Sequence, residues 1–486
     1  MTVPELRIRA ANDRPMRADG QIVVYWMTAF RRTGWNSALD RAVAHARVLD
    51  KPLLVLEALR CGYRWASDRL HRFVLDGMRD NAARFAGTPV RYYAYVEPAW
   101  GEGRGLLAAL AQSACVVVGD DYPAFMLPRM VAAAARQIPV RFELVDGNGL
   151  LPLRAASQVF PTAYAMRRFL QRTLPEHLLD LPVADPLRAL RLPPAPPVSE
   201  AIRRRWPEAD PAVLTGTGAV LGALPIDHTV APVAYAGGER AGRARLRAFL
   251  REQLADYVER RNQPEADATS RLSPYLHFGH VSVHEVFAEL ARLEGWSPAR
   301  LSPKGTGART GWWRMGPSAE AFLDQLVTWR ELGFNMCWQR PDYDQYGSLP
   351  DWARRTLAVH ARDPREHRYT LEQLESAATH DPLWNAAQRQ LVREGRIHNY
   401  LRMLWGKKIV QWTNRPQMAL EVMIQLNDKY AVDGRDPNSY SGISWVLGRY
   451  DRAWGPERPV FGTVRYMSSE NTARKVRVRD YIRRYS

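Results

Sequence analysis

Short apolar runs alternate with amphipathic stretches through the first part of the chain, from about residue 20 to residue 150. Five of the runs have the length and composition of buried strands, namely Ile22–Trp26, Leu53–Leu56, Val90–Val96, Val116–Val118 and Val140–Phe142. Helical periodicity fills the intervals between them, most clearly over Ser37–Leu49 and Asp68–Phe85. Strands that recur about every thirty residues with a helix between them predict an α/β fold with a doubly wound parallel sheet.

Doubly wound sheets bind their ligands outside the carboxyl ends of the strands. This stretch contains neither a GxGxxG nor a GxxxxGK[ST] sequence. The pattern therefore disfavours a conventional dinucleotide or nucleoside-triphosphate site in the predicted α/β part of the chain.

A proline-rich passage separates this part from the rest of the chain. Pro182 and Pro186 precede the run Pro193–Pro197, and proline at this density continues neither a helix nor a central strand. From about Ser199 apolar residues recur at helical spacing, over Arg243–Arg260, Ala321–Phe334, Pro382–Arg393, Asn399–Trp412 and Gln417–Leu426. We therefore expect an α/β N-terminal domain (residues 1–180), a linker (181–240) and an all-helical domain (241–486).

The net charge of the chain indicates what kind of partner it binds. The 486 residues carry a formal net charge of +17, and Thr472–Ser486 holds six Lys or Arg against one Asp. Clustered cations of this kind favour a polyanion such as nucleic acid, although an Arg-rich proteome would give the same excess. No apolar run is long enough to cross a membrane, and the N-terminus has no signal-peptide pattern.

The cysteines Cys61, Cys115 and Cys337 are odd in number and far apart in the sequence. This spacing argues against a disulfide framework and against a structural metal site, and it fits a reducing cytoplasm. We therefore expect a cytoplasmic protein without a bound metal.

Three segments carry candidate chemistry. The stretch Ala268–Gly279 combines hydroxyls, an Arg and a helix entry that could cradle an anion, or it is an ordinary capped helix start. Trp405 and Trp412 lie seven residues apart, so they share a helix face about 10 Å apart along its axis, with Trp384 on a neighbouring helix. A tryptophan stripe is also common in a core. The third segment, Asn427-Asp428 followed by Asp433–Asn438, reads as a turn rich in Asp, Asn, Gly and Pro.

In this order the segments resemble the photolyase/cryptochrome superfamily, in its class II cyclobutane-pyrimidine-dimer photolyase branch. The resemblance rests on Thr269–Ser273 with Tyr257 twelve residues upstream, on Trp329-Arg330-Glu331, and on an almost continuous run from Tyr369 to Tyr485. That run includes Thr379–Ala386, Arg402–Ile409, Leu426–Tyr430, Asp433–Asn438 and Arg458–Met467. The similarity is strong from about residue 240 onward and looser over residues 20 to 180.

The resemblance implies that the helical domain binds FAD and that the reduced flavin repairs cyclobutane dimers in UV-damaged DNA by light-driven electron transfer. The residues matched to FAD phosphates and linker are Tyr257, Thr269, Ser270, Arg271, Leu272 and Ser273. Those matched to the isoalloxazine surroundings are Arg402, Asn427, Asp433 and Asn438. We favour Asn427 over Asn438 as the amide that faces flavin N5.

The same resemblance assigns the indoles and the lesion pocket. Trp384, Trp405 and Trp412 match the class II relay that re-reduces oxidised flavin. Trp329, Met403 and Trp445 match the pocket for a dimer flipped out of the DNA stack. No local motif decides whether the N-terminal domain binds an antenna chromophore; the class II resemblance implies a deazaflavin. A monomer is the expected oligomeric state.

One position departs from the class II pattern. Gln325 stands where that pattern has a Glu that hydrogen-bonds the dimer, and an amide cannot transfer a carboxyl proton. Gln recurs at this place in the (6-4) photolyases, but Met403 replaces the second histidine of those enzymes. If the register is off by one, Asp324 supplies the acid. The alternatives are therefore a cryptochrome-like photoreceptor without repair and a photolyase of altered lesion specificity.

Overall fold

A computed structural model describes residues 3–486, which form two compact units. Unit 1 comprises the chain up to Ala155 together with Thr173–Arg247 and Arg271–Gly295. Unit 2 comprises Ala156–Arg172, Ala248–Ser270 and Trp296–Ser486. The sequence predicted two domains, residues 1–180 and 241–486, joined by a linker of residues 181–240. Domains of this kind are parts of the chain that fold independently, and the division stays a prediction.

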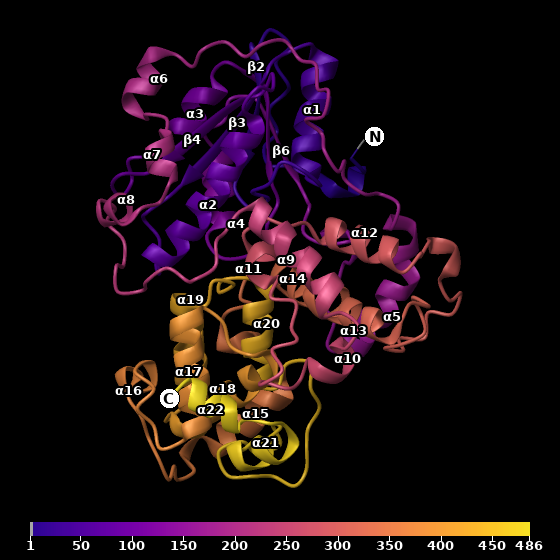
Figure 1. Ribbon diagram of the computed structural model, residues 1–486, viewed down its shortest axis with the longest axis vertical. Coiled ribbons are helices and arrows are strands. Elements are labelled where there is room, and N and C mark those ends of the chain that lie inside the picture. The colour runs from indigo at the N-terminus through magenta and orange to yellow at the C-terminus, as the bar shows by residue number, and fades with distance from the viewer. Residues whose placement is uncertain (1–2) are drawn as a thin grey trace. The chain divides into compact units, whose positions relative to one another are not determined.

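Unit 1 is an α/β structure. Its strands are β1 (Ile8–Ala10), β2 (Ile22–Met27), β3 (Leu53–Leu59), β4 (Arg91–Val96), β5 (Ala114–Asp120) and β6 (Arg141–Val145). The crossover helices are α1 (Ser37–Leu49), α2 (Asp68–Phe85), α3 (Leu106–Ala111) and α4 (Leu127–Ala135) (Figure 1). Further along the chain come α6 (Glu200–Arg205), α7 (Pro211–Leu214), α8 (Gly218–Gly222), α9 (Glu239–Glu252), α11 (Ser273–His277) and α12 (Val283–Leu293).

The six strands form one sheet in the order β1-β6-β5-β2-β3-β4. Strands β2 to β6 are parallel, which confirms the doubly wound fold predicted from the sequence. The sheet is nevertheless mixed, because β1 pairs with β6 in antiparallel register from Ile8 opposite Val145. This edge strand was not predicted, since three residues with a central Arg9 show no hydrophobic alternation.

Alternate residues of the strands face opposite layers of helices. Val24 and Trp26 of β2 belong to a buried cluster with Leu106 and Leu110 of α3 and Val131 of α4. The strand residues between them face the other side of the sheet, because side chains alternate along a strand. Burial on both faces explains why the strands read as continuous apolar runs.

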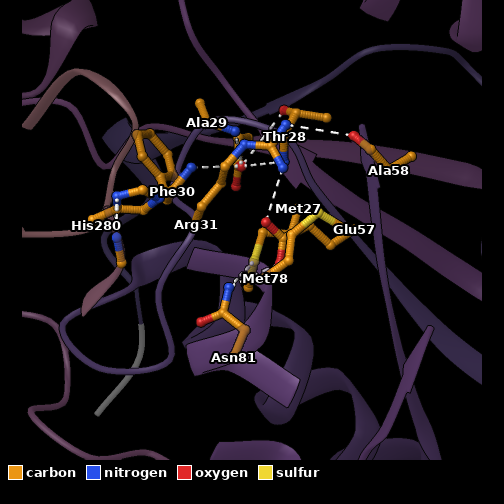
Figure 2. Close-up of polar contacts among 12 residues, drawn as sticks. Met27, Thr28, Ala29, Phe30, Arg31, Glu57, Ala58, Met78, Asn81 and His280 are labelled. Atoms are coloured by element: carbon orange, nitrogen blue, oxygen red, sulfur yellow. Dashed lines mark hydrogen bonds and ion pairs between the residues drawn. The ribbon is translucent and has the colours of Figure 1, made fainter. Parts of the chain in front are cut away.

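Two buried carboxylates close the carboxyl ends of the central strands. Glu57 of β3 accepts hydrogen bonds from Arg31 Nη1 and Asn81 Nδ2, both at 2.8 Å (Figure 2). Asp120 at the end of β5 accepts from the backbone N–H groups of Thr28–Phe30 at 2.7 to 2.9 Å. The loop after β2 is thus held by groups of the protein itself, which satisfies buried polar atoms that would otherwise be costly.

Unit 2 is helical, which confirms the second part of the predicted fold class. It contains α5 (Ala163–Thr173), α10 (Tyr257–Arg260), α13 (Pro317–Leu323), the π-helical segment η5 (Asp324–Trp329) and α14 (Arg330–Gln339). These are followed by α15 (Asp351–Val359), α16 (Leu371–Glu375), α17 (Pro382–Glu394), α18 (Asn399–Trp412), α19 (Pro416–Tyr430), α20 (Pro437–Val446), α21 (Ser469–Lys475) and α22 (Arg479–Arg484). Helices α17, α18 and α19 pack together, with α22 against α17 (Figure 1).

Two of the predicted helices differ from the sequence expectation. The helix expected over Arg243–Arg260 is interrupted between α9 and α10, where Leu254 N donates to Phe249 O (2.9 Å) and closes the helix. The hydroxyl of Ser318 then donates to the exposed Ala255 carbonyl (2.8 Å). The helix expected over Ala321–Phe334 is part of a longer run, α13–η5–α14, with a π-helical turn in its middle.

None of the helices within residues 3–486 combines the length and the apolar character that crossing a membrane requires.

Candidate functional site

The three predicted indoles of unit 2 form one buried cluster. Trp384 of α17 and Trp405 and Trp412 of α18 are 0, 2 and 1% exposed. Trp384 Nε1 donates to the Trp405 carbonyl (3.0 Å), and the Trp384 and Trp412 rings meet edge to face with centroids 5.3 Å apart. Trp405 Nε1 donates to Gln388 Oε1 (2.9 Å). The link between the two indoles of α18 therefore runs through Trp384 of the neighbouring helix.

A tyrosine and a histidine extend this cluster to the surface. The ring centroids of Tyr369 and His380 lie 5.1 and 5.5 Å from that of Trp412. Tyr369 OH and His380 Nδ1 are hydrogen-bonded (2.6 Å), and the His380 ring is exposed and stacks on His367 with centroids 3.8 Å apart. Sequence reasoning missed this pair, although both residues lie inside the segment that resembles class II enzymes.

The protonation state of His380 suits a proton acceptor. Partial burial, and then the neighbouring His367, lower the pKa of His380 below its usual value. A neutral ring at physiological pH accepts the Tyr369 hydroxyl proton at Nδ1. The outer end of the indole cluster thus combines an oxidisable phenol with a base.

A second cluster joins α18 to α19 and the loop that follows it. Arg402 Nη1 donates to Asn427 Oδ1 (2.8 Å), and Arg402 Nη2 lies 3.8 Å from Asp433 Oδ1. Asn427 Nδ2 donates to Asp428 Oδ1 (3.0 Å). Arginine only donates and an ionised carboxylate only accepts, so the two partners fix which end of the Asn427 amide faces each of them. One amide N–H and one lone pair of Asn427 have no partner among residues 3–486.

Asp428 is the buried support of this cluster. Its carboxylate also accepts from Arg435 N (3.0 Å) and from Tyr440 OH (3.1 Å). Burial raises the pKa of Asp428, while the Arg435 guanidinium and these hydrogen bonds lower it. The residue holds the loop after α19 in place, because several donors converge on one carboxyl group.

Asn438, the competing amide, lies near the start of α20 and is half-buried. A Cβ added to Gly333 of α14 would lie 3.0 Å from Asn438 Oδ1. Asn438 therefore sits against the backbone of α14, whereas Asn427 belongs to the Arg402 cluster.

The predicted phosphate-binding residues lie around α10 and before α11. Tyr257 begins α10 and is buried against Phe249 and Phe322, with ring centroids 5.6 Å from each. The Arg261 guanidinium lies 5.7 Å from the centre of the Tyr257 ring, and Arg261 Nε is buried without a hydrogen-bond partner among residues 3–486. A buried donor left open in this way is costly unless a ligand accepts from it.

The segment from 269 to 273 falls at the boundary of the two units. Thr269 and Ser270 end one stretch of unit 2 and are half-buried. Arg271 is exposed with φ of 56°, Leu272 is buried, and Ser273 is the exposed first residue of α11. A positive φ at Arg271 is a local strain of the kind found at ligand sites.

Two of the predicted lesion-pocket residues stack on each other. The rings of Trp329, at the end of η5, and Trp445, in α20, lie 4.5 Å apart at an angle of 16°. Both are half-buried, as is Met403 in α18. The stack offers flat, polarizable rings from two different helices.

The side chains of Gln325 and Asp324 differ in the polar contacts that they make. Asp324 Oδ1 accepts from Arg167 Nε (2.9 Å), and both side chains are largely buried. The half-buried Gln325 amide makes no hydrogen bond to any residue in the described part of the chain. Asp324 is therefore committed to an ion pair, which disfavours the alternative that it is the acid in place of residue 325.

An exposed tryptophan that sequence reasoning missed lies after α20. Trp454 is 39% exposed, and the guanidinium groups of Arg452 and Arg465 lie 5.2 and 5.3 Å from the centre of its ring. In the sequence, Trp454 stands among arginines. Aromatic side chains stack on bases and arginines bind phosphates, so this composition could have indicated a nucleic-acid contact.

Comparisons with known proteins cover the whole chain. A deoxyribodipyrimidine photo-lyase of Methanothermobacter thermautotrophicus is 34% identical over 484 residues, 98% of this chain and 97% of the relative. One of Oryza sativa subsp. japonica is 36% identical over 480 residues, 95% of this chain and 87% of the relative. A crystal structure of a class III photolyase from Agrobacterium tumefaciens shares the fold at a TM-score of 0.67 and 18% identity, covering 96% of this chain and 86% of that one. No family model matches.

Proposed function

The chain belongs to the deoxyribodipyrimidine photo-lyase family, and from this we propose that it splits cyclobutane pyrimidine dimers in DNA by light-driven electron transfer with bound FAD. One observation carries the proposal. Arg402 of the polar cluster and Trp405 of the indole cluster are three residues apart on α18, so they are neighbours on one helix face. A chain of oxidisable rings thus begins one helical turn from the residues proposed to surround a flavin.

The residues present fit FAD. Asp433 Oδ1 is buried and lies within ion-pair distance of Arg402 but has no hydrogen bond among the described residues, and Arg261 Nε is likewise open. We assign Arg402, Asn427, Asp433 and Asn438 to the isoalloxazine and Tyr257 with Thr269–Ser273 to the phosphates and linker. When bound, FAD supplies the light absorption and the electron that opens the cyclobutane ring.

The side chains of the protein perform the remaining tasks. Asn427, oriented by Arg402 and Asp428, offers one N–H and one lone pair at the flavin edge. Trp384, Trp405 and Trp412 pass an oxidising equivalent outward, and Tyr369 with His380 receives it where a proton can leave. Burial keeps water from the indoles and keeps their rings at fixed separations.

The lesion pocket follows from the stacked pair. We propose that Trp329, Trp445 and Met403 accept a dimer flipped out of the helix, since rings stack on pyrimidines without reading sequence. Trp454, between two guanidinium groups, is suited to contact the disrupted duplex beside the lesion. The net charge of +17 supports contacts to DNA phosphates.

Within the family we propose the class II branch. The support is the nearly continuous similarity from Tyr369 to Tyr485, with all three relay indoles at the spacing of that branch. Gln325 favours the second candidate, a photolyase of altered lesion specificity or a photoreceptor without repair, because it replaces the expected Glu. We further propose that the protein acts as a cytoplasmic monomer; its three cysteines are buried and unpaired.

Unit 1 has an aromatic surface that is suited to binding an antenna chromophore. Tyr63, Trp65 and Phe125 lie in the loops after β3 and β5, with the Trp65 and Phe125 rings stacked at 6.0 Å. Trp65 and Phe125 have φ of 73 and 59°, an uncommon strain for aromatic residues. We propose that a planar chromophore, a deazaflavin by the class II resemblance, binds here at the carboxyl side of the sheet.

The direct test uses purified, chemically reduced protein and an oligonucleotide that contains a thymine dimer. We expect blue light to restore the thymines, and darkness to leave the dimer intact. Product analysis of an oligonucleotide with a (6-4) lesion separates the candidates. Bound and photoreducible FAD without repair of either lesion would favour the photoreceptor.

Replacing Gln325 with glutamate should raise the yield of dimer repair. A charged partner strengthens a hydrogen bond by about 1 kcal/mol over a neutral one, which corresponds to about a fivefold change. The measurement is repair per absorbed photon at saturating dimer, with Gln325→Ala as the control expected to fall below the parent. An unchanged or lower yield for Gln325→Glu would show that the amide at this position is already suited to the substrate.

A further inference from the structure

Four exposed cations of unit 2 gather on one surface outside the sites described above. Arg168 and Arg172 lie on α5, and Lys304 and Arg309 lie on the loop that precedes α13. We call these four residues the α5 basic surface. Tyr164, one helical turn before Arg168, is 57% exposed beside them.

Glycines let the loop approach the helix closely. A Cβ at Gly305 would lie 3.0 Å from Arg172 Cγ, and one at Gly307 would lie 2.8 Å from the Tyr164 ring. Gly307 has φ of 83°, which side chains rarely adopt. The backbone itself therefore packs against the side chains of α5.

Hydrogen bonds hold the loop on α5. Gln171 accepts from Gly307 N (2.7 Å) and donates to the Ala308 carbonyl (2.8 Å). Arg167 donates to the Gly307 carbonyl (3.4 Å) and forms the ion pair with Asp324. The cations of loop and helix are thus fixed relative to each other and to the π-helical segment that carries Gln325.

The base of the loop is anchored by indoles. Trp312 and Trp313 are buried, and their ring centroids lie 4.7 Å apart. Trp296 Nε1 donates to the Trp313 carbonyl (2.6 Å). A basic, glycine-containing loop would otherwise be free to move, so this anchoring preorganises its charges.

The charge of the surface is uncompensated. Residues 156–172 and 296–319 contain no Asp or Glu. Glu176 follows Arg172 by four residues but forms no ion pair within residues 3–486. The carboxylates that follow the loop, Glu320 and Asp324, are engaged by the loop backbone and by Arg167. Across residues 3–486, none of the four cations forms an ion pair.

Exposed arginines elsewhere are of two kinds, and three of them form ion pairs. Arg204 pairs with Glu200 (2.7 Å), Arg251 with Glu252 (2.6 Å) and Arg292 with Glu289 (3.0 Å). Exposed Arg47, Arg129 and Arg136 form no ion pair within residues 3–486 either, but they lie singly on other elements. The α5 basic surface differs because four unpaired cations lie together, and clustered cations favour an external anion.

We propose that the α5 basic surface binds the sugar-phosphate backbone of duplex DNA that flanks the lesion, which rests on the proposed function. Arg168 and Arg172 are four residues apart, which separates them by about 6 Å along the helix axis. Phosphates of one DNA strand are spaced by about 3.4 Å along the duplex axis, so two such steps span a similar length. A protein partner would need an apolar contact core, whereas Tyr164 is the one large exposed hydrophobic side chain within residues 156–172 and 296–319. Through Arg167 and Asp324, phosphate binding here also positions the segment of Gln325.

The test compares two variants of equal net charge. The first carries Arg168→Gln, Arg172→Gln, Lys304→Gln and Arg309→Gln. The control carries Arg204→Gln, Arg251→Gln, Arg292→Gln and Arg354→Gln, all at exposed, ion-paired positions. At physiological salt we expect the first to bind undamaged duplex about 10- to 100-fold more weakly, with a salt slope lower by about 2 to 4, and the control to bind like the parent.

Repair of a thymine-dimer dinucleotide separates this proposal from the proposed function, because that substrate lacks the flanking duplex backbone that the surface is proposed to bind. We expect both variants to repair it as the parent does. Duplex binding of the first variant at the parental affinity and slope, or an equal loss in the control, would overturn the proposal. A parent that repairs no dimer while the first variant still loses duplex affinity would overturn the proposed function alone. If the quadruple variant does not fold, the single variants Arg172→Gln and Lys304→Gln replace it in the test. Each is expected to lower the salt slope by about 0.9.

Discussion

Replacing Trp384 with phenylalanine should slow the photoreduction of oxidised FAD by at least about tenfold, about 1.4 kcal/mol in activation free energy. Trp384 is the contact between Trp405 and Trp412, through the bond to the Trp405 carbonyl and the edge-to-face ring contact at 5.3 Å. A phenyl ring keeps part of the packing but is much harder to oxidise than indole. The measurement is the loss of flavin absorbance at about neutral pH under blue light with an external thiol reductant.

The same variant should repair dimers at the parental yield once it has been chemically reduced, because the relay only restores the flavin. Trp312→Phe is a matched control, since Trp312 is also buried but lies in the loop anchor outside the indole cluster. Photoreduction of Trp384→Phe at the parental rate would refute the relay. Equal slowing in Trp312→Phe would assign the effect to packing.

Replacing Trp329 with alanine should weaken binding of a dimer-containing strand by about 5- to 100-fold, because base–aromatic stacking contributes about 1 to 3 kcal/mol per base. The substitution removes one ring of the Trp329–Trp445 stack, which leaves Trp445 without its flat neighbour. Affinity for undamaged duplex should change little. Titration of the two DNAs at one salt concentration measures both quantities.

Trp329→Phe should fall between the parent and the alanine variant, because it keeps a flat ring of smaller area. Trp100→Ala removes an exposed tryptophan of unit 1, 76% exposed, and should leave both affinities unchanged. A Trp329→Ala protein that prefers the dimer as strongly as the parent would place the lesion pocket elsewhere.

Periodicity was sufficient to predict the elements that are regular. The strands β2 to β6 and the helices α17 and α18 lie within a few residues of their expected bounds, because long apolar runs and clear caps mark them. The short edge strand β1 and the π-helical turn were not predictable, since neither leaves a repeating pattern. The break between α9 and α10 depends on Ser318, about sixty residues further along the chain.

The candidate site, too, was predictable in part. Resemblance named the three indoles, and the structure brings them together, but the spacing of Trp405 and Trp412 did not show that Trp384 joins them. The partnership of Tyr369 with His380 and the ion pair of Arg167 with Asp324 arise from contacts between distant segments. Such pairings depend on tertiary packing, which a local pattern does not contain.

The π-helical turn between α13 and α14 has a geometric consequence. A turn that closes one residue later than an α-helical turn shifts everything after it by one position, about 100° of rotation around the axis. The faces of α13 and α14 are therefore out of phase: residues after Asp324–Trp329 are rotated by about 100° from the positions that an uninterrupted α-helix would give them. The number of residues in this turn, and not only their identity, sets the angular position of Trp329 on the helix.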